Sequence, residues 1–279
     1  MFVNGTADQI VKMIPTVWSP LMFQELRNKI AYLNLFSRAY EGEIKEKGNT
    51  VKVNQIVAPN GEILTNDKDQ FNPEELAINQ FEITADRRAV ASFEITDLAK
   101  LQSLDFQMEM MNALVYSIQK QMEVDIQSIM IPSAAAPDHA LAALIGASFD
   151  VADVVALRTL LSVAKVPFDE NMYLALSPTF YGSLMQKNQV VSADFGSVND
   201  LMAGEVRKIA GFKVFEHNLE EGSKARAFHT SAVQVVTQSQ VNIQISNLHS
   251  QKKFGYLVSA DIVYGRKLAD AKRLAEVIV

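Results

Sequence analysis

Four histidines and the acidic residues near them are the side chains in this sequence best suited to metal binding or acid–base chemistry. They lie far apart along the chain, at His139, His217, His229 and His249. None of them belongs to a His-Glu-x-x-His motif or to a similar metal-ligand spacing. Only His217 has carboxylates close behind it, Glu220 and Glu221, and this cluster is more typical of a solvated loop than of a metal site.

Other catalytic motifs are missing from the sequence. The chain has no cysteine, which excludes disulfides, thiolate metal sites and cysteine nucleophiles. Its glycines form neither the Gly-x4-Gly-Lys-Ser/Thr nor the Gly-x-Gly-x-x-Gly spacing of phosphate-binding loops. The Gly-x-Ser-x-Gly motif that carries a serine nucleophile is also absent. Acidic pairs such as Asp150 and Asp153 are typical of the first turn of a helix. We therefore expect no enzyme activity, no cofactor and no metal, although catalytic groups that converge from distant positions stay an alternative.

Charge and hydropathy narrow the class of protein further. The 279 residues are 48% hydrophobic and carry a net charge of −6. No run approaches the ~18 apolar residues of a membrane span, and the first residues do not form a secretory signal, so we expect no membrane partner. Residues 41–97 contain twelve acidic and six basic residues, whereas the rest of the chain is balanced. This is the reverse of the basic stripe that free nucleic-acid binders carry.

A long ribbon that leads into a long helix is the most distinctive pattern. Residues 50–57 and 81–95 alternate apolar and polar side chains, which predicts two strands, and Pro59-Asn60-Gly61 predicts a turn between them. From residue 96 the apolar residues then follow a helical period to residue 131, and this predicts a continuous helix over residues 105–131. Residues 54–79 have almost nothing to bury against their own chain. This acidic arm is either a solvated projection or a segment that lies on a complementary surface of another subunit.

The remaining elements suggest a small mixed α/β domain followed by strands. Ser19-Pro20 predicts the start of a short helix over residues 20–30, and the prolines around residues 132–137 mark a domain boundary. After that boundary the pattern predicts helices and strands in alternation. They are a helix over 150–164, a strand over 173–176, a helix capped by Ser177-Pro178, a turn and strand over 208–215, and strands over 225–228, 233–237, 241–245 and 254–264. Residues 190–199 are polar and typical of a loop.

Several short motifs follow one another along nearly the whole chain. They are Val17-Trp18-Ser19-Pro20, Tyr40-Glu41-Gly42-Glu43, Lys47-Gly48-Asn49-Thr50-Val51, Phe93-Glu94-Ile95-Thr96-Asp97, Leu176-Ser177-Pro178, Gly204-Glu205-Val206 and Ile209-Ala210-Gly211-Phe212-Lys213-Val214. In this order they resemble the major capsid proteins of tailed bacteriophages, whose fold is shared with the herpesvirus capsid floor and with encapsulin nanocompartments. The individual motifs are loose, and their order and spacing are the specific part.

The resemblance implies an α+β phage major-capsid fold of four parts. These are an N-terminal arm (residues 1–39), an extended β-hairpin loop (40–95), a peripheral domain with a long spine helix (96–131 and 225–279) and an axial α/β domain (132–224). It also implies that residues in these parts contact neighbouring subunits. The candidates are Trp18, Pro20, Tyr40, Gly42, Gly48, Pro59, Gly61, Lys68, Gln189 and Gly204.

The function implied by the resemblance is that of a structural capsid protein. Such a chain self-assembles through pentamers and hexamers into an icosahedral virion capsid that encloses double-stranded phage DNA without sequence-specific contact. Assembly is expected in the host cytoplasm, with a scaffolding protein, a portal and a decoration protein as further candidate partners. No long N-terminal segment of the internal-scaffold kind precedes the arm, so scaffolding by a separate protein, or none, is expected. An encapsulin shell and a soluble α/β enzyme are the alternatives.

Overall fold

The computed structural model describes residues 30–40, 50–65, 70, 73–96, 107–134, 138–142, 149–186, 208–218, 224–238 and 241–278. Most of the predicted helix over residues 20–30 and the predicted loop over 190–199 lie outside these ranges.

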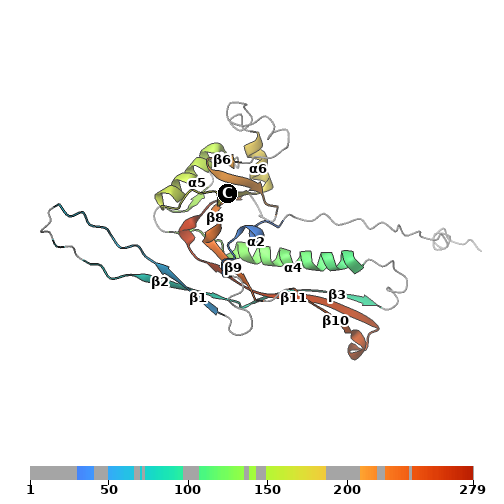
Figure 1. The fold of residues 1–279 in the computed structure, drawn as a ribbon. Helices are drawn as coiled ribbons and strands as arrows, with labels where there is room; N and C mark the ends of the chain where they lie inside the picture. The colour runs from blue at the N-terminus through green and yellow to red at the C-terminus, as the bar shows by residue number, and fades with distance from the viewer. Residues whose placement is uncertain are drawn as a thin grey trace, which may run out of the picture.

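The described residues form a stack of layers from which one hairpin projects (Figure 1). At the top of the view lies a mixed sheet, the upper sheet, with strand order β4-β12-β8-β5-β7-β6. At the bottom lies the lower sheet, in which β11 pairs with β10, β3 and β9. Helix α4 (Gln107–Ile129) lies between the two sheets, with the short helix α2 (Tyr32–Leu35) at its junction with the upper layer.

The upper sheet is built from strands whose side chains alternate between two cores. Its strands are β4 (Ala140–Ala142), β5 (Met172–Leu176), β6 (Lys208–Ile209), β7 (Phe212–Glu216), β8 (Lys224–His229) and β12 (Leu274–Ile278). On β5, Leu174 and Leu176 face a core shared with the helices above, whereas Tyr173 and Ala175 face the core below. The period of two that places successive side chains on opposite faces therefore lets one sheet cover two cores.

Two helices, α5 (Val151–Val163) and α6 (Pro178–Met185), cover the upper face of this sheet. At the start of α5, the Asp150 carboxylate accepts from the Val151 amide, and Asp153 accepts from the Asp150 amide in a capping box. The predicted first-turn role of both acids is thus confirmed. The predicted helix after Ser177-Pro178 is present, but the Ser177 side chain makes no capping hydrogen bond to it. Its hydroxyl instead accepts from the Lys224 amide of β8.

Below α4, the lower sheet consists of β3 (Arg87–Thr96), β9 (Val233–Thr237), β10 (Asn242–Asn247) and the long strand β11 (Gly255–Leu268). α4 packs on this sheet through a stripe of buried residues at helical spacing: Leu114, Ile118, Met122, Ile126 and Met130. The predicted helix over 105–131 therefore agrees with the structure to within two residues at each end. The predicted strands over 225–228, 233–237, 241–245 and 254–264 are also present.

One predicted strand, residues 81–95, is divided in two. Residues up to Thr84 belong to β2 (Ile78–Thr84), which pairs with β1 (Thr50–Ile56), and residues from Arg87 belong to β3, which pairs with β11. The chain changes sheets at Ala85 and Asp86. The sequence did not reveal this change, because no glycine or proline interrupts the segment between the two strands. Sequence patterns also missed β4 and β12, of which the first is very short and the second is uniformly apolar except for Glu276.

Candidate subunit-contact surfaces

Among the residues that the structure describes, those that anchor the projecting hairpin, β1 and β2, to the body lie at its base. The register pairs Thr50 with Thr84 at the base and Ile56 with Ile78 further out. Val51, Val53, Ile83 and Ala85 pack into a small buried cluster with Val236 of β9, and Tyr40 and Phe81 border it. This cluster, the root cluster, fixes the direction in which the hairpin leaves the body.

A glycine allows the close approach on which the root depends. A Cβ atom at Gly265 of β11 would lie 2.4 Å from the carbonyl oxygen of Thr84. Real Cβ atoms essentially never come so close to a heavy atom to which they are not linked through the local chain. Only the lack of a side chain lets β11 pass directly over the point at which β2 ends. The root is therefore held by backbone packing as well as by the apolar cluster.

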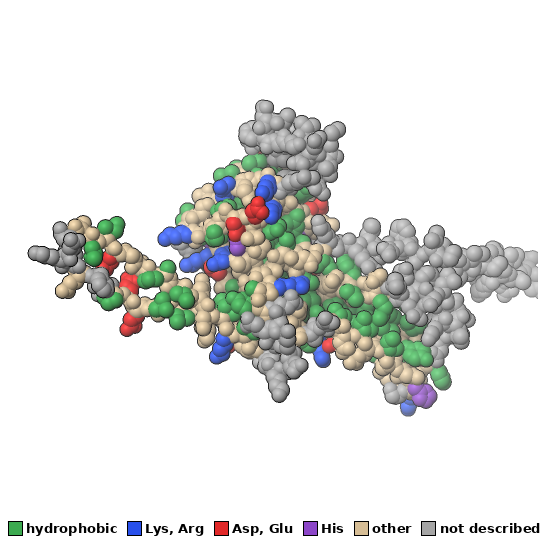
Figure 2. All heavy atoms as spheres, viewed as in Figure 1, with side chains coloured by type: hydrophobic (Ala, Val, Ile, Leu, Met, Phe, Trp, Pro, Cys, Tyr) green, Lys and Arg blue, Asp and Glu red, His purple; other side chains and the backbone are tan. Residues whose placement is uncertain are grey.

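Beyond the root, the hairpin exposes apolar side chains that no described part of the chain covers. Ile63 is 94% exposed and Ile56 is 66% exposed, and further apolar side chains on both arms are also exposed. The exposed set is Ile56, Val57, Ile63, Leu64, Leu76 and Ile78. Figure 2 shows hydrophobic side chains along this projecting arm. A two-stranded ribbon with apolar side chains and open edges is a typical surface for contact with another chain.

Polar contacts between the arms hold the exposed part of the hairpin together. The Asn60 amide and side chain both donate to the Glu74 carboxylate at 3.0 Å, which keeps the pKa of Glu74 below its usual value. Nearer the root, Gln80 donates to Asn54 and Lys52 pairs with Glu82. Exposed contacts of this kind contribute little stability each, so they give the arm little rigidity on their own.

The far end of the lower sheet carries a second exposed apolar surface. All residues of the edge strand β10 are exposed, with Ile245 66% exposed, and Phe254 in the following loop is 75% exposed. Lys252 and Lys253 lie beside Phe254, and Lys253 reaches Glu94 of β3. This tip lies at the opposite end of the molecule from the hairpin in Figure 1.

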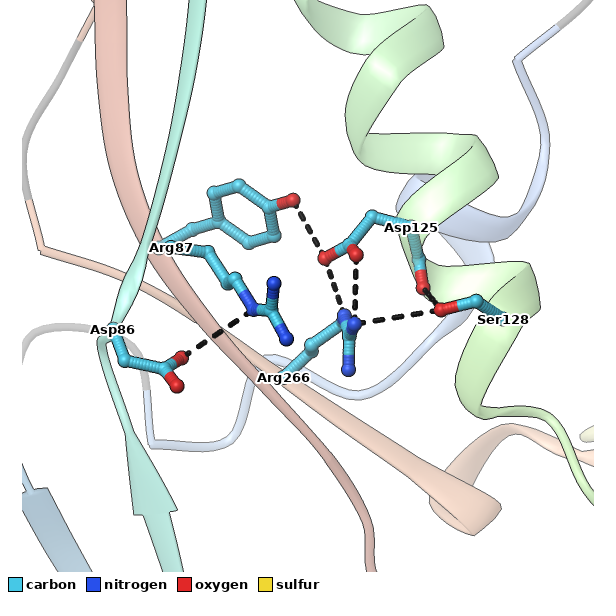
Figure 3. A network of polar contacts seen from close by, with 6 residues as sticks. Asp86, Arg87, Asp125, Ser128 and Arg266 are labelled. Carbon is cyan, nitrogen blue, oxygen red and sulfur yellow. Dashed lines mark hydrogen bonds and ion pairs between the residues drawn. The ribbon is translucent and has the colours of Figure 1, made fainter.

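Between β3 and α4 the surface forms a groove of about 550 Å³, lined by residues 87–92 of β3 and by Ser117, Gln121 and Asp125 of α4. Figure 3 shows the polar network at its end. Arg266 of β11 donates to Asp125 through Nε and, at 2.6 Å, through Nη2, and the hydroxyl of Tyr264 donates to Asp125 at 2.7 Å. This network fastens α4 to the strand that carries Gly265.

The network also sets the protonation of its members. Hydrogen bonding to Arg266 holds the pKa of Asp125 below its ordinary value. Burial, together with the hydrogen bond to the Asp125 carboxylate, raises the pKa of Tyr264. Asp125 is thus ionised and fully paired at neutral pH, and it serves as a structural anchor.

The environment expected for His217 is wrong. We expected a solvated loop, but His217 is fully buried, and its Nε2 lies 2.9 Å from Oε1 of Glu123. Glu220 and Glu221 lie outside the described residues. The sequence missed this pair because ninety-four positions separate its members. In the part of the chain that is described, no group of three or more His, Asp or Glu residues could hold a metal ion.

A second histidine forms a Ser-His-Asp arrangement by residue type. Nδ1 of His229 lies 2.6 Å from Oγ of Ser231, and Nε2 lies 3.3 Å from Asp169. Arg273 donates to the same Ser231 oxygen, and the Ser231 amide donates to Nδ1. The hydrogen bond from Arg273 occupies a lone pair of the Ser231 hydroxyl oxygen and so opposes its use as a nucleophile. The contacts join three connections of the fold, those that contain Asp169, Ser231 and Arg273.

The structure describes three of the ten residues expected at subunit contacts. Pro59 and Gly61 lie on the exposed part of the hairpin, whereas Tyr40 packs against the root cluster of its own chain. The other seven lie outside the described residues: Trp18, Pro20, Gly42, Gly48, Lys68, Gln189 and Gly204. All ten stay predictions as subunit contacts. The exposed apolar residues of the hairpin were not among the residues predicted from the sequence, although isolated apolar positions in a polar, turn-rich segment are a signal that could have revealed them.

The whole fold is that of known phage capsid structures. The structure from Mycobacterium phage Che8 has a TM-score of 0.78 at 21% identity, and the match covers 95% of this chain and 97% of that one. The capsid of the cyanophage P-SCSP1u has a TM-score of 0.71 at 15% identity, with 99% and 96% covered. The capsid of a native GTA particle has a TM-score of 0.71 at 11% identity, with 99% of each chain covered. None of the curated proteins matches the sequence.

The sequence independently identifies the family. The profile of the family described as phage capsid protein matches residues 80–278. The chain belongs to this family of phage capsid proteins. It is therefore a structural protein of the phage capsid, and the virion capsid is its location. This result confirms the resemblance noted from the sequence and does not favour the encapsulin alternative. Within the described residues, no helix is long and apolar enough to cross a membrane.

Proposed function

We propose that this chain is a non-enzymatic major capsid protein that assembles with copies of itself, through pentamers and hexamers, into a closed icosahedral shell around double-stranded phage DNA. The projecting hairpin is the arm that each subunit lends to the next. The observation that carries this proposal is the exposure of apolar side chains along both arms of the hairpin beyond the root cluster.

The described residues of the distal half of the hairpin bury no core of their own. An isolated two-stranded ribbon is at best marginally stable in water. Covering Ile63 alone against a neighbour contributes about 1.5–3 kcal/mol. A shell repeats this contact at every subunit, so a modest free energy per contact suffices for cooperative closure. The acidic residues of the arm add electrostatic specificity for the surface that receives it.

The domain assignment follows from the same proposal. Residues 1–39 are the N-terminal arm and residues 40–86 the extended loop, whereas α4, as the spine helix, and the lower sheet with β3 belong to the peripheral domain. The upper sheet with α5 and α6 forms the axial domain. Because β8 and β12 pair within the upper sheet and β3 pairs with β11 of the lower sheet, we assign residues 225–229 and 274–278 to the axial domain and residues 87–95 to the peripheral domain. This revises the division expected from the sequence.

The remaining partners follow from charge and from the closed geometry of a shell. A net charge of −6 gives the chain as a whole no attraction for DNA, which suits a genome that is packaged without sequence-specific contact. A portal, a scaffolding protein and a decoration protein are candidate partners of such a shell. Assembly takes place in the host cytoplasm.

The test is to replace residues 58–76 by a short Gly-Ser turn and to follow assembly by light scattering and electron microscopy. The wild-type protein is expected to form closed shells, and the shortened protein is expected to stay as folded subunits or small oligomers. A Val163→Ser variant, altered at an exposed apolar residue of α5 away from the hairpin, is the matched control. Closed shells of the shortened protein at wild-type yield would show that the hairpin is not the assembly arm.

A further inference from the structure

A segment of eight residues, 30–37, lies between α4 and the upper sheet, and we call it the strap. Its side chains Tyr32, Leu33 and Phe36 are buried in the core below the upper sheet. Tyr32 and Phe36 contact the ring of Phe228 on β8, with ring centroids 5.6 and 5.0 Å apart. The strap thus fills the space between the upper sheet and the helix beneath it.

One end of the strap is held by a buried carboxylate. Glu123 of α4, fully buried, accepts hydrogen bonds from the amides of Ala31, Tyr32 and Leu33 at 2.8, 2.7 and 2.9 Å. The same carboxylate lies 2.9 Å from Nε2 of His217, which follows β7 of the upper sheet. Burial alone would raise the pKa of Glu123, but the hydrogen bonds from His217 and the three amides outweigh it and leave this pKa below its usual value.

The contact that Nδ1 of His217 makes shows which of its two ring nitrogens donates to Glu123. Nδ1 of His217 lies 3.3 Å from Nε2 of Gln127, one turn further along α4. Because an amide NH₂ only donates, Nδ1 accepts and Nε2 carries the proton that His217 donates to Glu123. The ring also lies 4.4 Å, centroid to centroid, from Tyr32. Glu123 and His217 therefore join α4, the strap and the upper sheet at one point, which we call the latch.

The other end of the strap lies where three chain connections meet. The described parts of the connections between the upper-sheet layer and the layer of α4 and the lower sheet are residues 130–134 with 138–139, residues 230–232 and residues 269–273. These connections bond to one another: the Ser133 amide donates to Ala271, the Ala269 amide to Ala232, and Arg273 to Ser231. The strap joins them where the Ser37 amide donates to Thr230. The arrangement is that of a hinge.

Hinge and latch hold different parts of the upper sheet. The connections enter β4, β12 and β8, whereas the latch residue His217 follows β7, two strands beyond β8 in the order β8-β5-β7. With about 4.8 Å between neighbouring strands, the latch acts roughly 10 Å from the nearest hinge strand. The connections therefore hold one side of the upper sheet, and the latch ties its other side to α4, next to the apolar core that the two layers share.

We propose that the strap and its Glu123–His217 latch set the angle between the upper-sheet layer and the layer of α4 and the lower sheet, and that opening the latch lets this angle change. The inference rests on the proposed function, because a shell that places one chain in both pentamers and hexamers requires an adjustable subunit. A buried carboxylate with four donors is suited to this role, since it favours one position of the strap and disfavours partly shifted ones.

The experiment compares Glu123→Gln with Glu216→Gln, which neutralises an exposed carboxylate one residue before His217. An amide at position 123 offers one accepting oxygen instead of two, which leaves strap amides without acceptors. Hydrogen exchange is measured on the purified subunits, and the diameters of assembled particles are measured by electron microscopy. In Glu123→Gln, exchange of residues 31–37 is expected to be about tenfold faster or more, with β5 and β8 still protected and particle diameters more broadly distributed. His217→Ala, which removes one donor of four, is expected to give a smaller effect.

Three outcomes would overturn the inference: wild-type exchange in the strap of Glu123→Gln, equal acceleration throughout the upper sheet, or wild-type particle diameters despite a mobile strap. The Glu216→Gln control is expected to match the wild type in every measurement. If the wild-type protein formed no particles, the proposed function would fail, whereas the exchange measurement would still decide whether the latch holds the strap.

Discussion

Replacing Ile63 by serine tests the hairpin at its most exposed apolar side chain. Because Ile63 is 94% exposed in the subunit, its loss leaves the free energy of unfolding of the subunit unchanged. If a neighbour buries this side chain in the shell, the substitution removes about 1.5–3 kcal/mol from each contact. In the proposed shell each subunit lends one arm and receives one, so the loss would be one contact per subunit. Since about 1.4 kcal/mol corresponds to a factor of ten, the concentration needed for assembly rises by roughly 10- to 100-fold.

The assay is a concentration series of purified subunits followed by light scattering, with urea unfolding of the same samples. Val163→Ser, at a residue that is 60% exposed on α5, is expected to assemble at the wild-type concentration. The reasoning is refuted if Ile63→Ser assembles at the wild-type concentration, or if its urea midpoint falls as far as its assembly does.

Three further substitutions test the architecture behind the hairpin. Gly265→Ala places a Cβ 2.4 Å from a backbone oxygen and is expected to cost about 1–3 kcal/mol in urea unfolding, whereas Gly182→Ala, with open space around it, is neutral or stabilising. Asp125→Asn is expected to cost about 1.5–3 kcal/mol, as its charge-assisted bonds are lost. The wild-type contribution of Asp125 is present above its ordinary pKa of 3.8 and is lost as pH falls through the lowered native value, so the variant should show a weaker acid dependence of the urea midpoint. Asp150→Ala removes the capping box of α5 and is expected to lower the free energy of unfolding by about 1 kcal/mol. An unchanged urea midpoint would show that the cap does not stabilise the subunit.

Local patterns predicted those elements whose signals are local. The period of α4 is visible because its buried stripe repeats over many turns, and the capping box of α5 is visible because Asp150 and Asp153 lie three residues apart. The prediction of a single strand over 81–95 was wrong because the change of sheets at Ala85 depends on Gly265, which lies far away in the sequence. A close approach between two backbones leaves no periodic signal in either segment.

The candidate contact surface was predictable in part. Residues 54–79 were expected to lack partners within the chain, and in the described part of this segment every residue is exposed. The latch was not predictable, because Glu123 reads as one polar residue in a helix and His217 as one in a loop. Only the fold brings them to 2.9 Å. Distant pairs of this kind are hidden from periodicity and from motif spacing alike.

A reconstruction of the assembled protein by electron cryomicroscopy would show directly whether the hairpin lies on a neighbouring subunit. We expect a closed shell in which Ile56, Ile63 and Ile78 of one subunit are buried against an adjacent copy, with the root cluster unchanged. A shell in which these three side chains stay in solvent, as they do in the single subunit, would contradict this expectation.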